Sequence, residues 1–249
     1  MTHRFPGRLA LLTCAALALL MLRPAWADSP KKLTPAEDAD EHVVMAEKTF
    51  QNFLADPGQD YFRKALGKAQ GVLIIPASAR IGFIFSGAGG RGVLVARDES
   101  GKWIGPAFYT LSYASVGLQI GVQISEVIIL VMNQTAVNSL ISSSVRGGVD
   151  ATFAAGPVGV GTQTSFQGDF IALYRSKVLY GGLNVDGTIL SANDAWNTGY
   201  YGKPTTSVDI LVRHEVSNPK AAGLLNAVSD AAAQAAEHQV PTEPKAEKK

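Results

Sequence analysis

Residues 83–95 read FIFSGAGGRGVLV, and residues 87–92 within them fit the pattern G-x-G-x-x-G. In nucleotide-binding folds this pattern joins a strand to a helix, whose first N–H groups hold the phosphates. An alternating apolar run at 81–85 precedes the glycines and predicts a strand. The residues after the glycines, 93–97, also have the pattern of a strand. We therefore predict that the glycines form a wide hairpin with positive φ angles and bind no nucleotide.

The sequence on both sides of this stretch indicates an antiparallel sheet. Short apolar, β-branched and glycine-rich runs are separated by turn residues. The run 116–132 contains Gln119, Gln123 and Glu126, which favours buried strands over a membrane span. Asp186-Gly187 predicts a hairpin turn, and a short helix is expected at 133–142. The predicted strands are 72–75, 81–85, 92–96, 107–113, 117–124, 127–132, 149–155, 158–164, 170–174, 179–185 and 208–213.

Helices are predicted at both ends of the sheet region. Thr34-Pro35-Ala36-Glu37 combines an N-cap hydroxyl, a first-turn proline and a glutamate three residues on. Apolar residues then recur at spacings of four and three until Asp56-Pro57-Gly58, and a shorter helix is predicted at 59–68. An alanine-rich helix is predicted within 216–249, ahead of a tail whose proline and charge content indicates disorder. The pattern as a whole predicts an α+β fold.

The first 27 residues have the features of a secretory signal peptide. Arg4 and Arg8 precede an apolar run, and Ala25-Trp26-Ala27 supplies the small residues that signal peptidase reads. We expect an exported protein that begins at Asp28, with a polar leader at 28–33. The only cysteine, Cys14, lies in the removed segment, so the sequence predicts neither disulfides nor thiolate chemistry afterwards. The balance of charges does not suggest nucleic acid as a partner.

The sequence contains little that predicts catalysis. His42, His214 and His238 lack the spacing of metal ligands, and no G-x-S-x-G motif occurs. We therefore predict a non-enzymatic protein with no catalytic residue, metal or cofactor. Five aspartates could still converge in space, which leaves a hydrolase as an alternative: Asp150, Asp169, Asp186, Asp194 and Asp209.

Four strings of the sequence resemble the SYLF family of lipid-binding domains. They are GVLIIPASARIGFIFSGAGGRGVLVAR, GKWIGPAFYTLSYASVGLQIGVQISEVIILVMN, GGVDATFAAGPVGVG and NTGYYGK. The resemblance covers 34–212 and implies a lipid-binding domain over 34–215, with N-terminal helices on a curved, barrel-like, largely antiparallel sheet. It also implies binding to acidic phospholipids, and actin regulation in the eukaryotic members. The chain departs from those members by its signal peptide and by its lack of a Src-homology module or a zinc finger, so it resembles the exported bacterial branch and actin regulation is not expected.

A basic, amphipathic helical face is the expected lipid-binding site of a protein that associates peripherally with the periplasmic side of a membrane. Lysine and arginine attract an anionic surface, and aromatic side chains can enter the interface. The candidate residues are Lys31, Lys32, Tyr61, Phe62, Arg63, Lys64, Lys68 and the loop residue Arg91. The alternative is a structural or assembly protein of the cell envelope that binds a protein partner through strand edges or the alanine-rich helix.

Overall fold

The computed structural model describes residues 33–82, 85–116, 121–142, 144–157, 168–176 and 188–238. The predicted signal peptide, the leader lysines Lys31 and Lys32, the Asp186-Gly187 turn and the charged tail all lie outside these residues. The predictions made for them are therefore not addressed by the fold.

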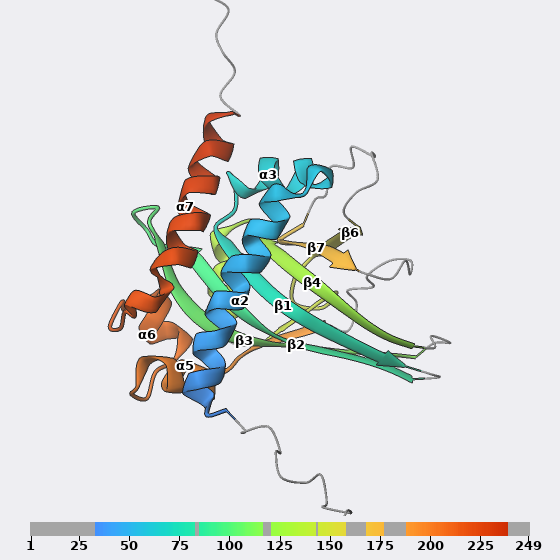
Figure 1. Ribbon diagram of the computed structural model, residues 1–249, viewed down its shortest axis with the longest axis horizontal. Helices are drawn as coiled ribbons and strands as arrows, with labels where there is room; N and C mark the ends of the chain where they lie inside the picture. The colour runs from blue at the N-terminus through green and yellow to red at the C-terminus, as the bar shows by residue number, and fades with distance from the viewer. Residues whose placement is uncertain are drawn as a thin grey trace, which may run out of the picture. The chain divides into compact units, whose positions relative to one another are not determined.

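The described strands form one curled sheet, an open half-barrel (Figure 1). Its order is β5-β8-β3-β2-β1-β4-β7-β6, and every neighbouring pair is antiparallel except β6 and β7. The predicted α+β class is confirmed. The strands are β1 (Gly71–Gly82), β2 (Phe85–Arg97), β3 (Trp103–Val116), β4 (Gly121–Val131), β5 (Val145–Arg146), β6 (Phe153–Pro157), β7 (Phe170–Ser176) and β8 (Thr188–Ala192).

The glycine run lies inside β2, so the predicted wide hairpin at 87–92 is wrong. None of the glycines in β2 has a positive φ angle. Their role is close packing instead, because a Cβ atom on Gly90 would lie 2.7 Å from Ile75 Cγ2, and one on Gly92 would lie 2.8 Å from Leu73 Cδ1. The other half of the prediction is confirmed, since a strand and not a helix follows Gly92. The helix N-terminus that holds phosphates in nucleotide-binding folds is therefore absent after Gly92.

One face of the sheet is covered by α2 (Pro35–Ala55) together with α3 (Asp60–Leu66), α5 (Asp194–Tyr201) and α7 (Ala222–Glu237). Figure 1 shows α2 in blue crossing the sheet with α7 in red. The predicted capping box is present, since the Thr34 hydroxyl accepts from the Glu37 N–H and Glu37 bonds back to the Thr34 N–H. Short 3-10 turns, η1 (Pro57–Gln59) and η2 (Pro219–Ala221), precede α3 and α7.

The opposite face packs against α4 (Gln134–Ser142) and α6 (Ser207–Leu211). Because both faces are covered, β1 and β4 carry continuous buried apolar runs at 72–75 and 127–131 instead of a polar alternation. The helix predicted at 133–142 is confirmed by α4.

The strand predicted at 208–213 is wrong, because this segment forms α6. Thr206 and Asp209 make a second capping box, which starts a helix in spite of the β-branched residues around it. Helix α5 was not predicted either; it is capped by Asn193 and ends at Gly202 with φ 71°. Both helices are short, so their capping residues give a clearer signal than their apolar periodicity.

Candidate functional site

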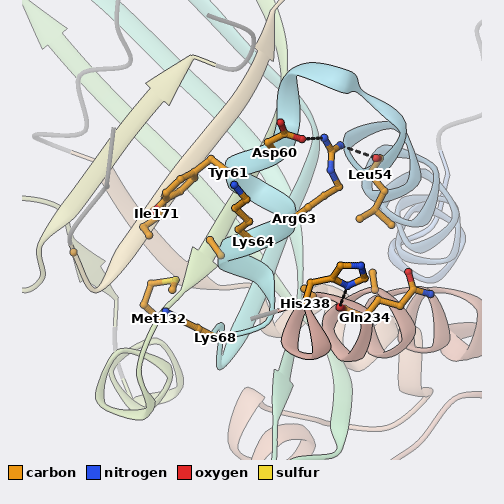
Figure 2. Close-up of a pocket in the computed structure, with 14 residues that line it drawn as sticks. Leu54, Asp60, Tyr61, Arg63, Lys64, Lys68, Met132, Ile171, Gln234 and His238 are labelled. Carbon is orange, nitrogen blue, oxygen red and sulfur yellow. Dashed lines mark hydrogen bonds and ion pairs between the residues drawn. The ribbon is translucent and has the colours of Figure 1, made fainter. Parts of the chain in front are cut away.

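A cavity of about 1010 Å³ lies between α3, α7 and the ends of β4 and β7 (Figure 2). We call it the α3–α7 cavity. Apolar side chains form much of its wall: Leu54, Ala65, Met132, Ile171, Ala231 and Ala235. Gly168 and the polar side chains complete it, namely Asp60, Tyr61, Arg63, Lys64, Lys68, Gln234 and His238. Four of the residues predicted for lipid binding thus line one cavity: Tyr61, Arg63, Lys64 and Lys68.

Lys64 lies in α3, whereas Lys68 lies in the turn that follows it, because the helix predicted at 59–68 ends at Leu66. Both side chains are exposed and line the cavity. The Lys68 ammonium makes no ion pair with any residue that the structure describes. The lysines therefore place positive charge beside an apolar wall.

Arg63 also lines the cavity, but its guanidinium is engaged by the protein. It donates hydrogen bonds to the carbonyl oxygens of Leu54 at 3.0 Å and Asp56 at 2.7 Å, and it forms an ion pair with Asp60. These bonds hold the connection between α2 and α3 in place (Figure 2). Arg63 is thus a structural residue of the cavity wall, and its pair with Asp60 offsets the one acidic side chain there.

Phe62 does not lie on the exposed side of α3, so its prediction as a lipid contact is wrong. The side chain is fully buried and meets Phe50 and Phe53 edge-on, with ring centroids 5.7 Å apart in both pairs. Phe62, Ala65 and Leu66 form the face of α3 that packs into the core. Tyr61 is half-buried and is the aromatic residue of this helix that lines the cavity.

Arg91 lies in strand β2, so its prediction as a loop residue is wrong. Its guanidinium carbon stands 4.7 Å from the ring centroid of Trp196 in α5. The same ring meets His42 edge-on at 4.7 Å, and burial together with the charge of Arg91 lowers the pKa of His42. In Figure 1, α5 and α3 lie at opposite ends of α2, so Arg91 belongs to a different part of the surface.

The described aspartates of the hydrolase alternative serve local structure. Asp169 accepts hydrogen bonds from the Thr152 hydroxyl and the Asn133 amide, and these bonds lower its pKa. Bonds from the Thr206 backbone and hydroxyl lower the pKa of Asp209 in the same way. Asp150 accepts a hydrogen bond from the backbone N–H of Arg146, and Asp194 accepts one from the side-chain amide of Asn197. Asp186 lies outside the described residues.

The described part of the chain contains no group of three or more His, Cys, Asp or Glu side chains placed to hold a metal ion. None of its helices combines the length and the apolar character needed to cross a membrane.

The family assignment follows from comparison with known proteins. Residues 112–231 match the model of the Ysc84 family, described as "Las17-binding protein actin regulator". This match supports the assignment of the chain to the Ysc84 (SYLF) family. The family resemblance of the sequence is thereby confirmed, and the matched residues include the end of β3 and all of β4, α5, α6 and η2.

Three curated relatives illustrate the match, and all three are eukaryotic. Protein YSC84 of Saccharomyces cerevisiae is 29% identical over 59% of this chain and 32% of its own length. LAS seventeen-binding protein 3 of the same yeast is 29% identical over 59% of this chain and 33% of its own length. The SH3 domain-containing YSC84-like protein 1 of Xenopus laevis is 25% identical over 66% of this chain and 50% of its own.

The chain thus spans about a third to a half of the Ysc84 proteins that it matches. None of these three names denotes an enzyme. No solved structure gives a significant match.

The close approach of α3 and α7 depends on Gly67, and this gives a first prediction. A Cβ atom at this position would lie 2.9 Å from the backbone nitrogen of Ala236. We expect Gly67→Ala to push the last turns of α7 away and to lower the free energy of unfolding by about 1 kcal/mol. Urea denaturation followed by circular dichroism measures the change.

The control for this variant is Ala233→Ser on the exposed side of α7. Gly101→Ala is unsuitable as a control because Gly101 has φ 83°, where alanine would be strained. An unchanged urea midpoint for Gly67→Ala would show that α7 has room for the added methyl group.

Proposed function

We propose that this SYLF domain is a non-enzymatic lipid-binding protein of the bacterial cell envelope, which docks on anionic phospholipid through α3. The observation that carries the proposal is the pair Lys64 and Lys68 beside the apolar wall of the α3–α7 cavity. Each cation near an anionic surface contributes about 1 kcal/mol, and adjacent apolar surface adds to binding when it enters the interface. Tyr61 is placed to make the aromatic contact.

Location in the periplasm is part of this proposal and rests on the predicted signal peptide. Mass spectrometry of an envelope fraction would find a mature N-terminus at Asp28. A cytoplasmic protein that retains Met1 would remove the envelope from the proposal while leaving lipid binding open.

Docking is tested by sedimentation with vesicles of phosphatidylglycerol or of phosphatidylcholine. We expect the protein to pellet with the anionic vesicles, and less so at high salt because the Debye length falls from about 10 Å at 0.1 M to about 3 Å at 1 M. Lys64→Glu with Lys68→Glu removes two favourable contacts, so affinity should fall about thirtyfold or more. Arg63 is left intact because it holds the α2–α3 connection.

The matched control reverses two exposed lysines elsewhere, Lys48 in α2 and Lys102 in the turn between β2 and β3. This variant has the same net charge as the α3 variant and should pellet nearly as the parent does. If the two variants lose binding equally, only net charge matters and α3 is not the docking face.

Binding of a protein partner is the second candidate, because the family is described by its binding of Las17. Two apolar side chains of α2 that face solvent, Val44 at 66% and Met45 at 36% exposure, offer a surface for it. Self-association or partner capture that persists without lipid, and that Val44→Ser with Met45→Ser abolishes, would favour this candidate.

A further inference from the structure

The α3–α7 cavity offers about 1010 Å³ of space beside the proposed docking residues. We propose that it takes up one acyl chain of an anionic lipid, so that the domain binds single lipid molecules as well as membrane surfaces. This inference rests on the proposed function, because it assigns the lipid headgroup to Lys64 and Lys68. It adds a defined binding place for the acyl chain of that lipid.

The composition of the wall is the first argument. Leu54 comes from α2, Met132 directly follows β4, Ile171 lies in β7, and Ala231 and Ala235 come from α7. A volume of about 1010 Å³ lies at the upper end of the range for sites that enclose a small ligand. A wall of this kind favours a flexible hydrocarbon, because each methylene removed from water adds to affinity and needs no polar partner.

The small side chains of α7 explain why the space exists. Ala231 and Ala235 lie four residues apart and so stand on one side of the helix, facing α3. The larger residues of the same helix, Leu224 and Val228, are fully buried in the main core. Helix α7 therefore fills the core with bulky side chains and faces the cavity with the methyl groups of Ala231 and Ala235 beside Gln234.

The charges at the cavity select the sign of the headgroup. Asp60 is the one acidic side chain among the lining residues, and it is paired with Arg63. Lys64 of α3 and Lys68 in the turn after α3 both line the cavity and bring positive charge to it. Lys68 makes no ion pair within the described part of the chain. Figure 2 shows both lysines and the apolar residues Met132 and Ile171 around one space. A phosphate joined to an acyl chain matches both halves of this arrangement.

Calorimetry with lysophosphatidylglycerols of ten, twelve and fourteen carbons, each below its micelle concentration, tests the inference without any bilayer. We expect the affinity to rise about fifteenfold for every two methylenes added, because the added groups are buried in the cavity. Equal affinities along the series, or no binding at all, would overturn the inference.

A second experiment separates the cavity from the docking face. Ala235→Phe fills the space and leaves Lys64 and Lys68 in place, whereas Ala233→Phe puts the same ring on the exposed side of α7. We expect Ala235→Phe to weaken lysophosphatidylglycerol binding at least tenfold and to keep its pelleting with anionic vesicles, and Ala233→Phe to change neither. Should Ala235→Phe fail to fold, Ala231→Leu replaces it.

The outcomes distinguish the two proposals. Pelleting without a chain-length effect overturns the cavity and keeps the docking face. Loss of pelleting for the parent protein, together with chain-length-dependent binding, overturns docking and supports the cavity.

Discussion

Replacing Phe62 with alanine is expected to lower the free energy of unfolding by about 3–5 kcal/mol. The ring is fully buried and packs edge-on against Phe50 and Phe53 of α2. Removing it leaves a cavity between α2 and α3 that the surrounding helices and sheet cannot close, so both the transfer energy and the packing contacts are lost. Denaturation in urea, with circular dichroism as the signal, measures the effect.

The neighbouring Tyr61→Ala variant is the control, because Tyr61 is half-buried at the cavity and contributes less to the core. It should retain most of the stability and lose part of the vesicle binding. The opposite result, a stable Phe62→Ala protein with weakened vesicle binding, would restore Phe62 as a membrane contact and contradict the packing of α3 described above.

Replacing Arg175 with methionine is expected to lower the free energy of unfolding by about 2–3 kcal/mol. The guanidinium on β7 binds Glu126 of β4 at 2.8 Å and Asp56 after α2 at 3.0 Å, and it stands 5.7 Å from the ring centroid of Phe53. Methionine keeps the apolar stem but leaves two carboxylates without their cation. The arginine side chain is 34% exposed, so the effect should be smaller than the 3–5 kcal/mol of a fully buried pair.

Arg213→Met provides the matched control for this variant. Arg213 pairs with Asp209 at 2.8 Å, but its side chain is 60% exposed and the pair lies within one turn. Its loss should cost less than about 1 kcal/mol. Equal midpoints for the two variants in thermal unfolding would mean that the Arg175 network does not tie α2 to the sheet.

The helices at the ends of the chain could be predicted from the sequence because their signals are local. Thr34 and Glu37 lie within one turn of each other, and their reciprocal hydrogen bonds depend on nothing outside that turn. The buried character of β4 was also predictable, since a strand covered on both faces carries an unbroken apolar run. The pair Lys64 and Lys68 was identified by its spacing alone.

Other features depend on contacts between distant parts of the chain. The local pattern of the glycine run suits a turn, but β1 and β3 pair with it on both sides and hold it as a strand. Tyr61 and Phe62 are adjacent aromatic residues, and the one that enters the core is decided by which side of α3 meets α2. Met132, Ile171 and Ala235 are separated by long stretches of sequence and line one cavity.

The sequence by itself therefore determined the family resemblance, the α+β class and the basic character of α3, because these follow from local patterns of side chains. Only the tertiary structure decided the place of the glycine run, the burial of Phe62, the engagement of Arg63 and the existence of the α3–α7 cavity. The physical reason is that these features come from the packing of α3 and α7 on the sheet, where small residues such as Gly67, Ala231 and Ala235 allow close approach or leave space.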